Sequence, residues 1–538
     1  MRRSLVVLPI LVIGAGVFFA SRLGGSDGPS LATPKFVDET VAAGVDHAYD
    51  GEFPFFVGGG VATFDCNGDN LPELFFAGGV NDSELYVNKS AVGGQLAFQR
   101  DDSPLLRRPN VTGAYPIDID GDATTDLVVL GRGGNTILRG LGNCAFEDAT
   151  TSLGLTAGKE WTVGFSATWE AGQRLPTLAF GNYLVPDTYD CSSNELFRPQ
   201  GDRYATADRL PAHCTLSILF SDWNHDGNRD LRVSNDRNYD RAAKEQMWRI
   251  RPGEAPHEYD EADGWRQLTI WGMGIASQDV DSDGKPEVFL TSQADNKLQK
   301  LDEGAKGPAY RDIALDAGVT AQRPYTGGDV LPSTAWHPEF DDVNNDGYFD
   351  LFIAKGNVEG QPDYASNDPN NLLLGTKTGK FVERGDEAGI ANDSRARGAA
   401  VVDLNLDGLL DLVVVNRRVP VEIKRNVGAG TADSPKPLGH WLALRPRQAA
   451  PNVDAIGAWV EVRVDGRVLS REVTVGGGHA SGELGWVHFG LGKASSAEVR
   501  AQFPGDEPGP WSRVDADGFY VIDRATGSPV RSEISANP

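Results

Sequence analysis

Hydrophobic residues along the chain fall into short runs that are separated by turns rich in glycine and acidic residues. Residues 73–79 (ELFFAGG), 126–132 (DLVVLGR) and 411–417 (DLVVVNR) are examples, with β-branched or aromatic residues at the centre of each run. Runs of this length and composition are typical of short β-strands rather than of helices. The pattern therefore predicts an all-β, turn-rich protein.

These runs belong to an internal repeat. Six segments share the pattern D-x-[DN]-x-D, three further residues, an acid and an aliphatic residue, and successive segments start 53, 104, 57, 63 and 61 residues apart. The long interval contains residues 169–178 (WEAGQRLPTL), which keep the frame of the repeat but lack its acids. The sequence thus predicts seven units, six of them acidic.

Each unit has the succession of strands that is typical of a propeller blade. A strand leads into the acidic loop, a second strand follows it, and two shorter strands complete the unit, which predicts a seven-bladed β-propeller over residues 35–435. The alternative is a stacked β-solenoid. The last unit, residues 397–427, has only three strands, and residues 35–38 (KFVD) resemble a fourth. We expect this N-terminal strand, with Phe36, to complete the last blade and close the ring.

The acidic loops predict bound cations. Oxygen ligands at alternate positions of a curled loop suit Ca²⁺, which takes six to eight of them. We expect about six structural Ca²⁺ ions, held by the residues at positions 1, 3, 5 and 9 of each loop. These residues are Asp65, Asn67, Asp69, Glu73; Asp118, Asp120, Asp122, Asp126; Asp222, Asn224, Asp226, Asp230; Asp279, Asp281, Asp283, Glu287; Asp342, Asn344, Asp346, Asp350; Asp403, Asn405, Asp407 and Asp411.

Position 6 of these loops requires a left-handed turn. It is glycine in four loops and Asn70 in the first, whereas Ala123 in the second adopts that conformation less easily. We therefore expect the second loop to be the weakest site. The alternative interpretation is that each loop is only a solvated acidic turn.

The N-terminus and the cysteines indicate export. Arg2 and Arg3 precede an apolar run over residues 5–20, which is typical of a signal peptide or an N-terminal membrane anchor within residues 1–25; residues 26–34 read as a linker. A buried segment of a cytosolic protein is the alternative. The four cysteines suit an oxidising compartment, which makes a secreted, periplasmic or surface-anchored protein the expectation.

Disulfide pairing is open at this stage. Cys191 and Cys214 bracket a polar segment and are expected to pair, which would leave Cys66 for Cys144. Four cysteines allow three connectivities, so the sequence does not fix the bridges.

The net charge of the chain bears on which partners it can bind. The chain carries 76 acidic and 50 basic residues, a net charge of −26. This balance excludes general binding to nucleic-acid phosphates. Twenty of the 76 acidic residues lie in the six loops. Much of the negative charge is therefore expected to bind metal ions rather than a macromolecular partner.

Beyond residue 436 the acidic pattern stops. Alternating strands such as 440–446 and those within 455–475 are separated by Gly and Asp-Gly turns, which predicts a small β-sandwich over residues 436–538. The loops resemble the FG-GAP/VCBS repeats of integrin-α-like propellers. Residues 452–458, 476–478 and 487–492 resemble an ASPIC/UnbV domain, and the pairing resembles the cartilage-acidic-protein-like family. The resemblance implies an exported calcium-binding propeller without assigned catalytic activity.

The sequence gives little support for an enzyme. G-x-S-x-G, H-E-x-x-H and phosphate-binding loops do not occur in the sequence. His479 and His488 could form a metal pair, but strand-edge histidines in the sandwich are the favoured interpretation. We therefore expect a non-catalytic adhesion or ligand-binding module; the alternative is an extracellular polysaccharide-acting enzyme with its site on the propeller face.

The expected ligand is an extracellular protein or glycan. We expect it to contact inter-strand insertions over residues 183–211, 235–264 and 355–371, whose aromatic residues include Tyr239, Trp248 and Tyr364.

Overall fold

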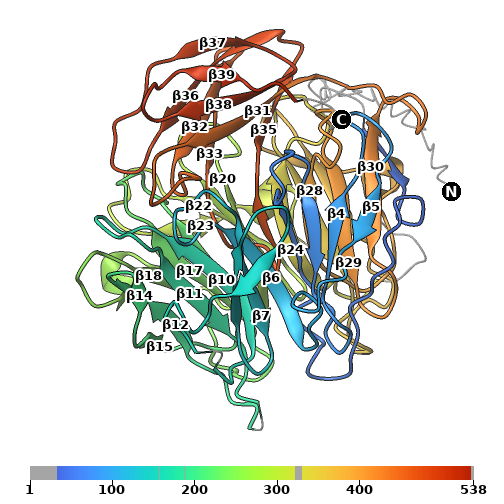
Figure 1. Cartoon of the computed structure of the whole chain (residues 1–538). Helices are drawn as coiled ribbons and strands as arrows, with labels where there is room; N and C mark the ends of the chain where they lie inside the picture. Colours follow the sequence, from blue (N-terminus) through green and yellow to red (C-terminus); the bar gives the residue numbers. More distant parts are fainter. Residues whose placement is uncertain (1–32, 157, 187, 321–329, 535–538) are drawn as a thin grey trace, which may run out of the picture.

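A computed structural model describes residues 33–156, 158–186, 188–320 and 330–534 (Figure 1). The predicted targeting segment at residues 1–25 and most of the predicted linker lie outside the described residues. Within the described ranges, no helix is both long and apolar enough to cross a membrane.

Seven antiparallel sheets form a ring of blades, as the repeat predicts (Figure 1). In order from the inner strand outward, blades one to three consist of β2 (Val61–Phe64), β3 (Glu73–Phe76), β4 (Glu84–Asn88), β5 (Phe98–Arg100); β6 (Val111–Ile117), β7 (Asp126–Gly131), β8 (Thr136–Gly140), β9 (Phe146–Asp148); β10 (Thr162–Thr168), β11 (Thr177–Asn182), β12 (Asn194–Phe197) and β15 (Asp208–Leu210).

Blades four to seven follow the same order. They consist of β16 (Thr215–Ser221), β17 (Asp230–Asn235), β18 (Gln246–Arg249), β19 (His257–Glu258); β20 (Gly272–Gln278), β21 (Glu287–Ser292), β22 (Lys297–Leu301), β23 (Tyr310–Asp312); β24 (Ala335–Asp341), β25 (Asp350–Lys355), β26 (Asn371–Gly375), β27 (Phe381–Glu383); β28 (Ala396–Val402), β29 (Asp411–Asn416), β30 (Glu422–Gly428) and β1 (Lys35–Asp38).

The ring closes through the N-terminal strand, as predicted. β1 pairs antiparallel with β30, and Phe36 lies opposite Asn426. Phe36 is buried in the core between blades six and seven. Because β1 supplies the outer strand of blade seven, strands from both ends of the propeller segment share one sheet.

Two predicted insertions are partly regular structure, which corrects the sequence interpretation. Residues 183–211 contain β12, β15 and a hairpin of β13 (Pro199–Gln200) and β14 (Arg203–Tyr204). Residues 235–264 contain β18, β19 and a short 3-10 helix, η1 (Glu261–Asp263). The outer strands of these blades are short and polar, so their sequence resembles that of loops. Two further short helices, α1 (Ala314–Ala317) and α2 (Gly385–Ala388), follow outer strands.

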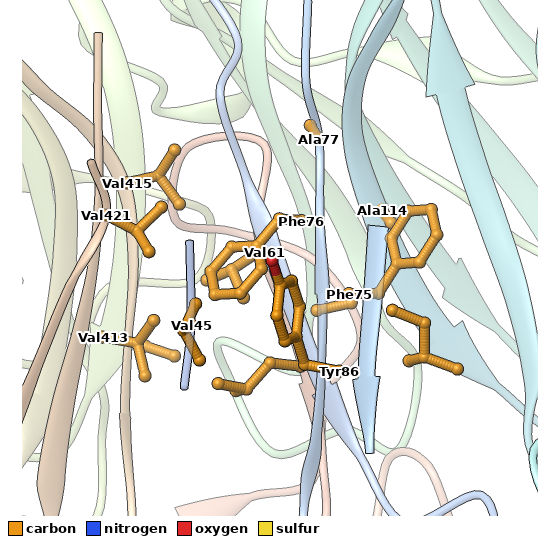
Figure 2. Close-up of a cluster of buried hydrophobic side chains, with 14 of the residues drawn as sticks. Val45, Val61, Phe75, Phe76, Ala77, Tyr86, Ala114, Val413, Val415 and Val421 are labelled. Atoms are coloured by element: carbon orange, nitrogen blue, oxygen red, sulfur yellow. The ribbon is translucent and has the colours of Figure 1, made fainter. Parts of the chain in front are cut away.

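Apolar faces of neighbouring blades form the propeller core. In Figure 2, Phe75 and Phe76 of β3 lie among side chains from other blades, including Val413 of β29 and Ala114 of β6. Each of these side chains is buried, which explains the apolar run that follows every acidic loop.

Two sheets of the C-terminal region form the predicted sandwich on top of the ring in Figure 1. Their strands, in sheet order, are β35 (Val487–Gly492), β31 (His440–Arg447), β38 (Gly518–Asp523), β39 (Pro529–Arg531); β33 (Arg467–Glu472), β32 (Trp459–Val464), β36 (Ser496–Gln502) and β37 (Ser512–Asp515).

Residues 475–484, which we call the plug, leave the sandwich and enter the centre of the ring. Its strand β34 (Gly482–Leu484) pairs in parallel with the inner strand β2. Isolated β-bridges join other plug residues to the inner strands β6, β10, β16 and β20. The plug was not predicted from the sequence, which suggested only turns at its glycines.

Both disulfides join neighbouring blades. Cys66 pairs with Cys144, linking blade one to blade two, and Cys191 pairs with Cys214, linking blade three to blade four. These are the bridges that the sequence favoured among three connectivities.

Candidate metal-binding loops and the domain interface

All six acidic loops connect the inner strand of a blade to its second strand, so they lie on one face of the ring, the loop face. In each loop the aspartate at position 1 accepts backbone hydrogen bonds from the residues that follow. Asp403 accepts from Asp407 N at 3.0 Å and Gly408 N at 2.7 Å. Asp342 binds the equivalent groups of its own loop. These bonds curl the chain around the first carboxylate.

Positions 4 and 6 both adopt left-handed backbone conformations. At position 6, φ is 69° for Asn70 and Ala123 and 81–83° for the four glycines. At position 4, φ is also positive in every loop, including 57° for Leu406. The sequence analysis missed position 4; glycine at this position in the first two loops, Gly68 and Gly121, was the available signal.

Closing acids at position 9 tie each loop to its blade. Asp350 accepts from Val343 N at 3.0 Å, within the loop, and from Gly375 N at 2.8 Å, at the end of β26. Asp411 makes the same pair of bonds in blade seven. The loop and the third strand are thereby held together through one carboxylate.

Three of the predicted ligands lie close together in each of two loops, and two of them are hydrogen-bonded to each other in each of the other four. The candidate ligand oxygens of Asp118, Asp120 and Asp122 lie within 4.8 Å of one another, as do those of Asp279, Asp281 and Glu287. In the other four loops the asparagine at position 3 donates a hydrogen bond to the acid at position 5 or position 9 of its own loop. The donor set is that of a hard cation site.

Two buried acceptors in these loops have no hydrogen-bond partner among the described residues. They are Asp120 Oδ1 in blade two and Asn405 Oδ1 in blade seven. Burial of an oxygen without a partner is costly, and a bound cation would satisfy it. The residues therefore fit a divalent cation in these two loops.

Burial raises the pKa of several carboxylates in the acidic loops and so disfavours their ionised form. It raises the pKa of Glu73 to about 8 and that of Asp126 to about 8. Burial, followed by repulsion from Asp346, raises the pKa of Asp342 well above its ordinary value. A divalent cation bound in a loop would neutralise these carboxylates and cross-link the two strands that flank the loop.

Among the described residues, basic side chains pair with the candidate ligand carboxylates of three loops. Arg139 Nη2 lies 2.6 Å from Asp120 Oδ2 in blade two, and Arg251 pairs with Asp226 and Asp230 in blade four. In blade five, Lys300 Nζ contacts three carboxylates of the loop. The acidic loops are therefore not equivalent.

The sandwich packs directly on the loop face. His225, at position 4 of the blade-four loop, stacks on Trp459 with ring centroids 4.0 Å apart. Asn345, at position 4 in blade six, pairs with His488 Nε2 at 2.6 Å. Leu406 of the blade-seven loop packs in one apolar cluster with Trp441. The acidic loops thus support the second domain.

His488 lies on an edge strand of the sandwich, as the favoured interpretation expected, whereas His479 does not, which corrects that interpretation. His479 lies in the plug, fully buried, where Nε2 accepts a hydrogen bond from Gly58 N at 3.1 Å. His488 lies on β35 and stacks on Trp441. Burial lowers the pKa of His479 to about 3 and that of His488 to about 4, so both are neutral.

A cavity of about 250 Å³ is lined by residues of the plug, the inner strands and the sandwich. Glu339 on β24 and Glu483 on β34 both line its wall. Burial raises the pKa of Glu339 to about 8 and that of Glu483 well above its ordinary value. Arg471 from the sandwich pairs with the neighbouring Asp341 at 2.7 Å.

The opposite face of the ring, the open face, carries an aromatic cluster. Phe53 lies 5.4 Å from Tyr189 and 6.4 Å from Tyr239 between ring centroids. Tyr189 is 53% exposed and Tyr239 is 45% exposed. Trp248, which the sequence placed on this binding surface, is instead buried between blades three and four. Its side chain lies on the face of β18 that packs into this core.

Comparisons with known proteins identify two segments. The family model of ASPIC and UnbV matches residues 448–529, and that of the FG-GAP-like repeat matches residues 342–414. The sequence matches no curated protein.

Solved structures give distant similarities. A crystal structure of BBS1N in complex with ARL6DN is 11% identical, covers 73% of this chain and 97% of that chain, and has a TM-score of 0.42. An Agrocybe aegerita lectin that recognises non-reducing terminal N-acetylglucosamine is 14% identical, covers 66% and 88% of the two chains, and has a TM-score of 0.38.

The two disulfides and the FG-GAP-like repeat indicate an exported or extracellular protein. The chain thus combines an FG-GAP-like repeat with an ASPIC and UnbV domain, as its sequence motifs predicted.

Proposed function

We propose that this protein is an exported, calcium-stabilised β-propeller that binds an extracellular protein or glycan without catalysing a reaction. The observation that carries the metal part is the shared backbone geometry of the six acidic loops, each of which curls around the carboxylate at position 1 and holds left-handed residues at positions 4 and 6. Ca²⁺ is the ion that this donor set suits, with oxygens from positions 1, 3, 5 and 9. Its role is structural, because the loops support the sandwich.

The ligand surface is assigned to the open face. The plug occupies the centre of the ring and the sandwich rests on the loop face, which favours the open face for a large partner. On the open face, Tyr189 and Tyr239 expose ring area beside Phe53. Exposed aromatic rings on a rigid support suit stacking on sugar rings or anchoring of a protein loop.

A glycan and protein array, probed with and without Ca²⁺, tests this assignment. We expect ligand retention without turnover, and loss of retention in Tyr239→Ala. Val530→Ala is the matched control, because Val530 is 63% exposed but lies on β39 of the sandwich, away from the open face. Retention that is unchanged in Tyr239→Ala would contradict the assigned surface, and product release from a polysaccharide would contradict the non-catalytic role.

A further inference from the structure

Lys300 occupies the centre of the blade-five loop. Its Nζ lies 2.6 Å from Asp281 Oδ2, 2.7 Å from Asp283 Oδ2 and 2.7 Å from Glu287 Oε1. These acids hold positions 3, 5 and 9, which are the positions expected to ligate a cation. An ammonium group has three N–H donors, and each of them meets one carboxylate. The side chain is only 16% exposed, so water competes little for these bonds.

The strand register shows that this arrangement is particular to blade five. Lys300 follows Gln299, which pairs with Val288, the aliphatic residue at position 10 of the loop. The residues at the same register are Val87 in blade one and Leu374 in blade six, which carry no charge. In blade seven it is Arg425, whose guanidinium is bound to Glu39.

In blades two and four a basic side chain also contacts the acidic loop, but it reaches fewer of the predicted ligand positions. Arg139, at the equivalent register, reaches only position 3 of its loop. Arg251 reaches positions 5 and 9 of the blade-four loop. Only in blade five, among the described residues, does one basic group contact positions 3, 5 and 9 together.

We infer that Lys300 is the resident cation of the blade-five loop and that this loop folds without binding Ca²⁺. The inference rests on the proposed calcium binding of the other loops and refines it. A metal ion and an ammonium group cannot occupy the same space among the three carboxylates. Displacing the ammonium would cost three short charge-assisted hydrogen bonds. The chain therefore stabilises one loop of the ring independently of the calcium concentration.

The test counts Ca²⁺ per chain in Lys300→Met and in the wild type, after metal removal and equilibration with saturating Ca²⁺. We expect Lys300→Met to bind one more ion than the wild type. Lys297→Met is the matched control, because Lys297 lies on the same strand and pairs with Asp312, outside any acidic loop; it should bind as many ions as the wild type. Equal counts for Lys300→Met and the wild type would overturn the inference.

A second variant keeps the test decisive if Lys300→Met does not fold. Asp283→Asn, in the otherwise unchanged chain, should leave the Ca²⁺ count as in the wild type, whereas loss of one ion would overturn the inference. Failure of the calcium proposal itself is distinguishable, because the wild type would then bind no Ca²⁺. In that case a single ion gained by Lys300→Met would still support the inference, and none gained would overturn it.

Discussion

The backbone N–H of Gly58, just before the first blade, donates a 3.1 Å hydrogen bond to Nε2 of His479, 421 residues later in the chain. The N–H of His479 in turn donates to His337 Nδ1 of blade six at 3.0 Å. The C-terminal domain therefore reaches through the plug into the middle of the propeller. The two domains share one buried hydrogen-bond network, and we expect them to unfold together.

Replacing Gly60 by alanine tests the tight fit of the plug. A Cβ atom at this position would lie 1.8 Å from the carbonyl oxygen of Ala480, so the plug or β2 would have to move. We expect the free energy of unfolding to fall by about 3 kcal/mol in a denaturant titration. Gly360→Ala is the control, because its Cβ would meet nothing within 4 Å. Equal effects of the two substitutions would contradict the position of the plug.

The carboxyl pair between the plug and blade six predicts an unusual pH dependence. Because the pKa of Glu339 is raised to about 8, the folded protein holds a proton that the unfolded chain releases near its ordinary pKa. Stability from this group is fully present below that ordinary value and is lost as the pH rises to about 8. The groups facing it are Glu483, Asp341, Arg471 and His337, and burial lowers the pKa of His337 to about 4, so it stays neutral over this interval.

Glu339→Gln, which cannot titrate, should therefore gain stability relative to the wild type as the pH rises from about 5 to 8. Melting temperatures measured across this interval in the presence of a chelator provide the comparison. Glu507→Gln, on the exposed surface, is the control. A wild-type-to-variant difference that stays constant with pH would refute the raised pKa of Glu339.

Ala123 offers a stabilising substitution. Its φ of 69° strains an L-residue, which the sequence analysis anticipated for this loop. Ala123→Gly should raise the free energy of unfolding by about 1 kcal/mol, since relief of strain exceeds the added freedom of the unfolded chain. Ala42→Gly, at an exposed residue without positive φ, should instead lower it. Destabilisation by Ala123→Gly would show that the left-handed turn is not formed.

Local pattern was enough to predict the blades, because each repeat carries its own strand and loop signals. Phe36 could be assigned to the last blade because the last unit lacks a fourth strand in its own sequence. The strand at residues 35–38 belongs to no other unit and can fill that place. The cysteine pairing was favoured only because Cys191 and Cys214 bracket a polar segment; that each bridge joins neighbouring blades became visible in the structure.

Other features depend on contacts that no local pattern reveals. The plug lacks hydrophobic periodicity, and its partners are backbone groups of several inner strands. Trp248 lies in a segment as polar as a loop, yet it packs in the core. Lys300 is separated from Asp281 by 19 residues, and only the register of β21 and β22 brings them together.

The central claim is that Ca²⁺ in the acidic loops supports the fold and the docked sandwich. The most direct test is the melting temperature of the wild-type protein before and after complete metal removal, with the Ca²⁺ content determined on the same samples. We predict several bound Ca²⁺ ions per chain, a marked fall in melting temperature on removal, and recovery when Ca²⁺ but not Mg²⁺ is restored. A protein that contains no Ca²⁺ and melts at the same temperature with and without chelator would contradict the account.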